Sequence, residues 1–242
     1  MEKKISHVDL FKFVEKIFIQ LQFSPENARL ATDVLVSADL RGVDSHGVAR
    51  LPGYINLLEK GRANAHPDIH LEHETASTAR INGDRGLGLI TGPKAMLLAI
   101  KKAQQVGSGW VAVNNSNHFG IAAYHAMLAL NYNMIGISMT NASPLVAPTH
   151  SKERLLGTNP ICFAAPAGAE PPFIMDMATT TAANGKLEVL QRRNDPVPTG
   201  WAQDANGHDT NDPYILEKGG AMKPLGGDHG GHKGYCLGAM VD

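Results

Sequence analysis

A change in hydrophobic periodicity near residue 69 is the feature that most restricts what this chain can fold into. Before it, apolar residues recur three or four positions apart, as on the buried face of a helix. After it, short apolar runs typical of strands alternate with longer stretches of helical period. Such alternation is typical of an α/β core. We therefore predict an α/β protein with an N-terminal helical portion, residues 1–68, followed by an α/β domain, residues 69–242.

Local signals set the expected positions of the elements. A first helix is expected over residues 8–21, and a second begins at Ser24, because Pro25 then occupies a first-turn position where its missing N–H costs nothing. A third helix is expected from 45 to 59, although Pro52 inside it is awkward because proline removes a backbone donor. The later expected elements are strands at 69–73, 79–82, 109–113 (buried), 134–140, 161–165 and 173–177, helices at 93–106 and 121–131, and a polar connection at 194–213.

Charge and hydropathy exclude several kinds of partner. The 242 residues carry 22 basic and 23 acidic side chains spread along the chain, so no basic patch for nucleic acid or a membrane surface is expected. No apolar run approaches the roughly 18 residues of a membrane span, and the N-terminus lacks the apolar stretch of a signal peptide. Cys162 and Cys236 lie far apart in apolar surroundings, which favours free thiols. The sequence therefore predicts a cytoplasmic protein.

The segment 41–54 has the chemistry of an acid-binding site. It places Ser45, His46, Arg50 and Tyr54 within ten residues. Histidine exchanges a proton near neutral pH, arginine binds a carboxylate with two hydrogen bonds, and the two hydroxyls can orient a substrate oxygen. A 2-oxo or 2-hydroxy acid requires this combination of groups. The alternative is structural, with the serine capping a helix, the histidine solvated and the arginine paired with a nearby acid.

This segment and four later ones resemble the motifs of the malate/L-lactate dehydrogenase family, which is unrelated to the Rossmann-fold dehydrogenases. The family also includes ureidoglycolate dehydrogenase and 2,3-diketogulonate reductase. The later motifs follow in the family's order: Asn114–Gly120, Leu156–Pro160, Asp176–Thr179 and His232–Tyr235. The resemblance implies a mixed-sheet, non-Rossmann core that binds NAD or NADP, and a homodimer. It implies hydride transfer between the cofactor and a small 2-oxo/2-hydroxy acid of the malate/lactate type.

The resemblance also assigns catalytic roles within the first motif. His46 matches the family's catalytic histidine, which would protonate the carbonyl oxygen as hydride arrives at carbon. Ser45 would help fix the substrate or the imidazole ring, Arg50 would bind the substrate carboxylate, and Tyr54 would add a contact. Residues 1–68 then form the substrate-binding and catalytic portion.

A second histidine competes for the proton-transfer role. His118, in the second motif, occupies a position that some family members use for proton transfer. We prefer His46 as the main acid/base. The alternative for His118 is an orienting or packing role where a strand ends before a helix.

The remaining motifs supply residues from the 69–242 domain, which the resemblance makes the cofactor-binding domain. Asp176, Met177 and Ala178 are expected to line the cofactor pocket, unless the aspartate only caps a helix at 178–183. Lys233 lies between glycines and would offer its ammonium to a cofactor phosphate or ribose from a backbone turn, or would simply be exposed there.

The third motif, LGTNP, is expected to form a rigid loop that shapes the pocket. Thr158 and Asn159 would bind the substrate by hydrogen bonds, or would only satisfy the turn. Neither role follows from the residue types alone, because threonine and asparagine serve both.

Two further patterns suggest other functions and are not adopted. Glycines 86, 88 and 92 are spaced one residue wider than the Rossmann fingerprint, and no acid occurs from Lys101 to Asn117, so a flexible turn before a helix is the better interpretation. His70 and His73 are one residue short of the spacing of a zinc-binding HExxH pair. A metal-dependent hydrolase is therefore poorly supported, and no metal is predicted.

One departure from the family leaves a competing hypothesis. Family members usually continue well past the HKGY motif, whereas this sequence stops at Asp242. The expectation is that the family's C-terminal segment is missing. The chain would then be either an active dehydrogenase or a catalytically silent, truncated member that only binds dinucleotide or a partner chain. The choice among malate, lactate, ureidoglycolate, diketogulonate and sulfolactate also stays open, because Arg50 would hold any of their carboxylates.

Overall fold

The structure is a computed structural model that describes residues 5–242. The chain forms two compact units. The first comprises the chain up to Gly136 together with Ala164–Phe173, and the second comprises Ile137–Phe163 and Ile174–Asp242. The N-terminal helices share a compact unit with the first sheet, and the division into a substrate portion (1–68) and a cofactor domain (69–242) stays a prediction.

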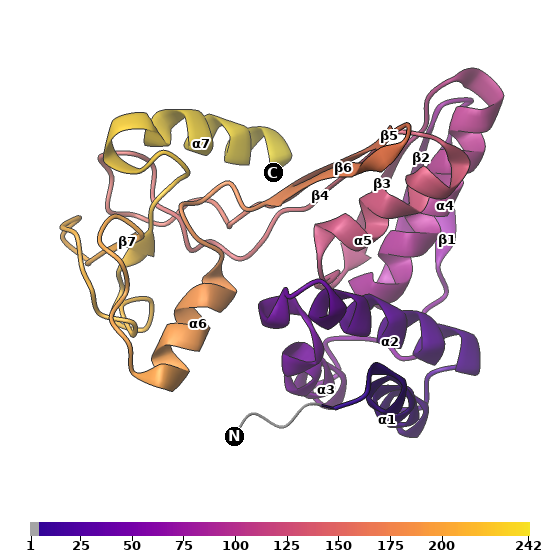
Figure 1. The fold of residues 1–242 in the computed structure, drawn as a ribbon, viewed down its shortest axis with the longest axis horizontal. Helices are drawn as coiled ribbons and strands as arrows, with labels where there is room; N and C mark the ends of the chain where they lie inside the picture. Colours follow the sequence, from indigo (N-terminus) through magenta and orange to yellow (C-terminus); the bar gives the residue numbers. More distant parts are fainter. Residues whose placement is uncertain (1–4) are drawn as a thin grey trace. The chain divides into compact units, whose positions relative to one another are not determined.

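Helices form the N-terminal part of the first unit, as predicted (Figure 1). Helix α1 spans His7–Gln20 and α2 spans Pro25–Leu40. The N-terminus of α2 has the expected chemistry: the Ser24 hydroxyl accepts a hydrogen bond from the Asn27 N–H at 3.2 Å, and Pro25 is the first helical residue.

The third predicted helix begins later than expected. Two short 3₁₀ turns, η1 (Asp44–His46) and η2 (Val48–Arg50), precede helix α3 (Leu51–Glu59). Pro52 therefore lies in the first turn of α3, where it removes no helical hydrogen bond and causes no kink. The prediction of one continuous helix from 45 was wrong, because the motif residues before it are held by tertiary contacts described below.

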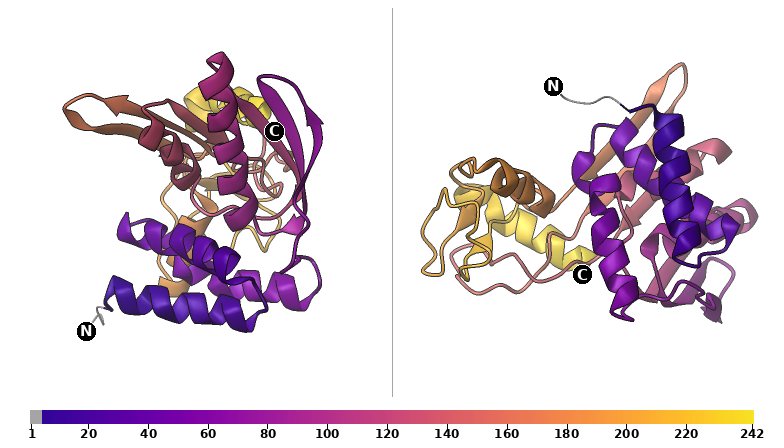
Figure 2. Two further views of the ribbon diagram at one scale, coloured as in Figure 1. Left: turned by 90° about the vertical axis from the view of Figure 1, so that its right-hand side faces the viewer. Right: turned by 90° about the horizontal axis from the view of Figure 1, so that it is seen from below.

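After these helices, the first unit contains a three-stranded sheet of order β1-β2-β3 and a helix that connects two of its strands (Figure 2). Strand β1 (His70–Glu74) is antiparallel to β2 (Thr78–Gly86), and β2 is parallel to β3 (Trp110–Ser116). Helix α4 (Gly88–Val106) connects the two parallel strands. The prediction that the third strand is buried was wrong, since most of β3 is exposed.

Apolar side chains of the helices and of the start of α4 form the core of the first unit. Phe18 of α1 and Leu35 of α2 are fully buried, and they belong to one cluster with Leu87, Leu89 and Ile90. Burial of this kind provides most of the driving force for folding. The cluster explains why the N-terminal helices and the first βαβ segment form one unit.

A glycine in the link between α4 and β3 tests how closely the chain packs against this helix. An alanine at Gly109 would place its Cβ 1.9 Å from the carbonyl oxygen of Ala99, so backbone would have to move. We expect Gly109→Ala to lower the free energy of unfolding by about 1–3 kcal/mol. Gly53→Ala, in α3, meets nothing within 4 Å and should be neutral or gain up to about 1 kcal/mol. Urea denaturation measures both changes, and equal midpoints for the two variants would contradict the expectation.

The chain crosses between the units in a second small sheet. Helix α5 (Ala122–Met127) and the 3₁₀ turn η3 (Leu128–Tyr132) lead to this sheet, whose strand order is β4-β5-β6. Its strands are β4 (Gly136–Met139), β5 (Ile161–Ala167) and β6 (Glu170–Met177). All three match apolar runs in the sequence, and each contains one of the three points at which the chain passes from one unit to the other.

The second unit is built from two helices and a two-stranded sheet. Helix α6 spans Asn184–Arg193, the antiparallel pair is β7 (Ala202–Gln203) with β8 (Ala221–Met222), and α7 spans Gly227–Val241. Its core cluster includes Val146, Leu187, Val197, Ala202 and Met222. Helices with small mixed sheets make up both units, so the predicted α/β class with an N-terminal helical portion is confirmed.

Candidate active site

The two 3₁₀ turns that carry the first motif are held by a residue of α2. A carboxylate oxygen of Asp39 accepts a hydrogen bond from the Val48 N–H at 2.9 Å. Gly47 lies so close that a Cβ there would be 2.0 Å from the other Asp39 oxygen, so only glycine fits. Burial raises the pKa of Asp39, and the hydrogen bond from Val48 opposes this rise. The position of the motif therefore depends on a helix that precedes it.

Within the motif, three predicted residues contact one another. The Ser45 hydroxyl lies 2.9 Å from Nδ1 of His46, and Nε of Arg50 donates to the Ser45 carbonyl oxygen at 2.7 Å. All three side chains are half-buried. The arrangement fixes the imidazole and the guanidinium on the same short segment, as a carboxylate-binding acid/base site requires.

His118 joins this group although it lies far away in sequence. Its ring stacks near that of His46, with centroids 5.6 Å apart and planes 22° apart, and its Nδ1 lies 2.6 Å from the Tyr54 hydroxyl. The backbone N–H of Gly120 also points at Nδ1, at 3.3 Å. A backbone N–H can only donate, so Nδ1 is the unprotonated nitrogen, the Tyr54 hydroxyl donates to it, and the neutral ring carries its proton on Nε2.

The surroundings keep the His118 imidazole and the Tyr54 hydroxyl in their neutral forms. Desolvation, followed by electrostatic interactions with His46 and Arg50, lowers the pKa of His118 to about 3, although the residue is exposed by surface area. Burial raises the pKa of Tyr54 well above its ordinary value, and the charge of Arg50 opposes this shift only in part. At neutral pH the pair is a tyrosine hydroxyl bonded to a neutral imidazole.

A third histidine, His125, contacts the residue that follows His118. His125 of α5 is 2% exposed, and its Nε2 lies 2.8 Å from the carbonyl oxygen of Phe119. Because a carbonyl only accepts, Nε2 of His125 carries the proton. Its ring stacks on the Phe119 ring with centroids 4.7 Å apart. No sequence motif marks His125 or Asp39, so neither residue was predicted.

The burial of His125 predicts a pH-dependent contribution to stability. Burial lowers the pKa of this imidazole to about 4, from an ordinary value of about 6.5. Between about pH 6.5 and about pH 4 the unfolded chain therefore binds a proton that the folded chain does not, so stability falls as the pH falls. The expected slope from this residue is about 1.4 kcal/mol per pH unit. Urea denaturation at several pH values in this window should show a shallower slope for His125→Phe, and parallel slopes would refute the assignment.

The predicted residues of the LGTNP loop lie in the second unit. Asn159 is fully buried: its amide nitrogen donates to the Gly238 carbonyl and to the Asp242 carboxylate, each at 2.9 Å, and its oxygen accepts from the Ala142 N–H. A substrate contact by Asn159 would have to replace one of these bonds. Thr158 is half-buried, and its carbonyl oxygen accepts from the Thr179 N–H at 2.9 Å.

The residues expected at the cofactor also belong to the second unit. Asp176 is exposed in β6, while Met177 ends that strand and Ala178 follows it, both half-buried. The alternative that the aspartate caps a helix at 178–183 was wrong, because α6 begins only at Asn184.

The prediction that Lys233 lies in a glycine turn was also wrong. Lys233 lies in the second turn of α7, because the glycine-rich stretch before it continues as helix. Its side chain is exposed. An exposed ammonium on a helix can still pair with a phosphate.

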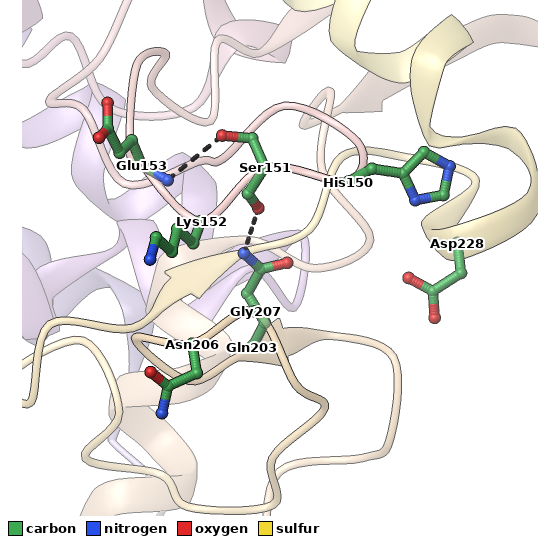
Figure 3. Close-up of a pocket in the computed structure, with 8 residues that line it drawn as sticks. All are labelled: His150, Ser151, Lys152, Glu153, Gln203, Asn206, Gly207 and Asp228. Carbon is green, nitrogen blue, oxygen red and sulfur yellow. Dashed lines mark hydrogen bonds between the residues drawn. The ribbon is translucent and has the colours of Figure 1, made fainter.

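A separate polar pocket occurs in the second unit (Figure 3). It has a volume of about 440 Å³, and none of the predicted site residues lines it. Its wall is held by the Gln203 amide, which donates to the Ser151 carbonyl at 2.6 Å. Lys152, Glu153 and Asp228 bring charges of both signs to it, a mixture that favours no single class of ligand.

Among residues 5–242, no group of three or more His, Cys, Asp or Glu side chains is placed to hold a metal ion. No helix within the same residues is both long and apolar enough to cross a membrane.

Comparisons with known proteins agree on one family. A family model described as malate/L-lactate dehydrogenase matches residues 5–242. A malate dehydrogenase of Pyrococcus abyssi is 48% identical over 99% of this chain and 67% of its own length. An L-sulfolactate dehydrogenase of Methanocaldococcus jannaschii is 47% identical over 90% of this chain and 61% of its own length. The chain thus spans about two thirds of the curated relatives that it matches.

Solved structures give the same result. The crystal structure of malate dehydrogenase from Entamoeba histolytica has a TM-score of 0.96 and 36% identity, covering 100% of this chain and 69% of that one. Malate dehydrogenase from Pyrococcus horikoshii OT3 has a TM-score of 0.91 and 46% identity, covering 99% of this chain and 66% of that one. Identity at this level over the full chain shows kinship as well as fold.

Proposed function

Because the chain belongs to the malate/L-lactate dehydrogenase family, we propose that it interconverts a small 2-oxo acid and its 2-hydroxy acid with a nicotinamide cofactor. The observation that carries the proposal is the group formed by His46, Arg50, Tyr54 and His118 in the first unit. It combines a proton-exchanging imidazole, a carboxylate-binding guanidinium and a neutral hydrogen-bond donor, which are the groups that reduction of a 2-oxo acid needs.

The two histidines have different roles in this proposal. His118 is neutral at working pH, with its proton on Nε2, so it serves as a hydrogen-bond donor to the substrate oxygen and not as the acid. A neutral imidazole acting in this way polarises a carbonyl without giving up its proton. His46 is then the residue that gives a proton to the oxygen during reduction and accepts it during oxidation. Ser45, bonded to Nδ1 of His46, holds the ring in place.

Arg50 orients the substrate in this scheme. Its guanidinium binds the carboxylate next to the reacting carbon, and its Nε bond to the Ser45 carbonyl fixes its position relative to the acid/base. This contact is common to all 2-oxo acids. The choice between malate, lactate and sulfolactate therefore depends on what surrounds the rest of the substrate.

The residues of the second unit fit a nicotinamide dinucleotide by their chemistry. The exposed carboxylate of Asp176 suits ribose hydroxyls, the exposed ammonium of Lys233 suits a phosphate, and the half-buried Met177 and Ala178 offer apolar surface to a ring. The bound cofactor would supply or accept the hydride. We propose NAD or NADP as the cofactor, a homodimer as the assembly and the cytoplasm as the location.

The test is oxidation of NADH and of NADPH by the purified chain with a panel of 2-oxo acids. The panel should include oxaloacetate, pyruvate and sulfopyruvate, and the loss of absorbance of the reduced nicotinamide reports turnover. Turnover that falls at least about 100-fold in His46→Asn supports the proposal and names the cofactor and the substrate. Cofactor binding without turnover, measured by fluorescence, would instead favour a silent member of the family. Light scattering of the same sample gives the oligomeric state.

A further inference from the structure

His125 is bonded to the peptide group next to His118. Its Nε2–H donates to the Phe119 carbonyl at 2.8 Å. That carbonyl belongs to the same peptide unit as the Gly120 N–H, which donates to Nδ1 of His118 at 3.3 Å. A hydrogen bond at the oxygen of an amide polarises the group and makes its N–H a better donor. A continuous polar chain therefore runs from His125 through one peptide to His118.

The peptide is fixed in the orientation that this chain requires. Gly120 has a φ of 80°, in the left-handed region that favours glycine, and an added Cβ would lie 2.9 Å from a methyl group of Val34. The stacking of the His125 and Phe119 rings holds the other side of the same turn. The turn is thus set by packing on one side and by the buried imidazole on the other.

The cost of burying His125 indicates a role beyond filling space. Its Nδ1 is buried and has no hydrogen-bond partner within residues 5–242. A buried acceptor without a partner is unfavourable, and an aromatic hydrocarbon would stack on Phe119 without that cost. A histidine at position 125 provides the hydrogen bond from Nε2 to the Phe119 carbonyl, which a hydrocarbon side chain cannot form.

We propose that His125 is a positioning residue which, through the Phe119–Gly120 peptide, keeps the proton of His118 on Nε2. Nδ1 of His118 then has two donors, the Gly120 N–H and the Tyr54 hydroxyl, and Nε2–H is left for the substrate oxygen. Burial lowers the pKa of His125 to about 4, so this imidazole stays neutral, with its single proton committed to the Phe119 carbonyl. The catalytic consequence rests on the proposed function, whereas the proton position on His118 does not.

Nitrogen-15 NMR of the imidazole rings tests the proton position directly. The His118 signals are assigned by their loss in His118→Gln, and the spectrum of the chain without cofactor or substrate should show Nδ1 unprotonated and Nε2 protonated. In His125→Phe, which keeps a ring but removes the donor, we expect a mixture of the two tautomers. In His125→Gln, whose amide nitrogen can replace Nε2, we expect the single tautomer to return.

Kinetics provide the second readout. With the 2-oxo acid that the wild type uses, His125→Phe should lower kcat by about two- to tenfold, the range of one neutral hydrogen bond. KM for the cofactor should stay unchanged, and His125→Gln should recover most of the loss. A wild-type His118 with its proton on Nδ1, or a His125→Phe variant with the single tautomer and full kcat, would overturn the proposal.

The NMR and kinetic measurements together distinguish a failure of this inference from a failure of the proposed function. If the chain shows no turnover with any 2-oxo acid, the tautomer comparison still decides the role of His125, because it needs no reaction. If His125→Phe does not fold, the wild-type spectrum and His125→Leu provide the same comparison.

Discussion

Replacing His46 with asparagine is expected to lower kcat for 2-oxo acid reduction at least about 100-fold, the smallest usual effect of losing a positioned general acid. Asparagine can still hydrogen-bond the substrate oxygen, so KM should change much less than kcat. The neighbouring His118 should not compensate, since its depressed pKa leaves it neutral and unable to act as an imidazolium acid at neutral pH. Steady-state kinetics at saturating cofactor give both constants.

Variants of His73, an exposed histidine, and of His118, the second candidate for proton transfer, serve as controls. His73→Asn removes an exposed imidazole from β1 and should leave kcat unchanged. His118→Asn should lower kcat by about tenfold, because it removes a neutral hydrogen bond and not the proton donor. A greater loss in His118→Asn than in His46→Asn would reverse the two assignments, and full turnover in His46→Asn would remove His46 from the mechanism.

Replacing Arg50 with glutamine is expected to raise KM for the 2-oxo acid by about 10- to 100-fold, the range of a hydrogen bond to a charged group. Binding of NADH or NADPH should be unchanged, because Arg50 is not among the residues that we assign to the cofactor. Arg50→Lys should recover only part of the loss, because an ammonium cannot form the paired bonds of a guanidinium. Initial rates over a range of substrate concentrations measure these differences.

The structural contact of Arg50 requires its own control. Its Nε bond to the Ser45 carbonyl also stabilises the segment that carries His46, so some loss of kcat should accompany the rise in KM. Arg62→Gln, which removes an exposed guanidinium just beyond α3, should change neither constant. An unchanged KM in Arg50→Gln would show that the substrate carboxylate binds elsewhere.

Local sequence signals predicted the regular elements well where their stabilising contacts are local. The start of α2 follows from Ser24 and Pro25 alone, since the cap and the first turn lie within four residues of each other. The strands of both three-stranded sheets were likewise found from short apolar runs. The exposure of β3 was not predicted, because the same apolar run can face either a core or solvent.

The predictions of local structure were wrong where contacts with residues distant in the sequence override local helix propensity, or where glycine permits more than one conformation. The 45–50 stretch has a helical pattern, but the bond from Val48 to Asp39 and the close approach of Gly47 hold it as two 3₁₀ turns. Around Lys233, glycine spacing indicated a turn, whereas the chain continues as α7. Glycine permits both conformations, so composition could not distinguish them.

The sequence by itself determined which chemical groups are available: two candidate histidines, an arginine and a tyrosine, recognised through the order of their motifs. The tertiary structure decided what these groups can do. Tyr54 and Gly120 fix which nitrogen of His118 carries the proton, and desolvation with a nearby guanidinium keeps that ring neutral. Tautomer and pKa depend on the donors and the dielectric around a group, and here much of that environment is brought in by residues distant in the sequence.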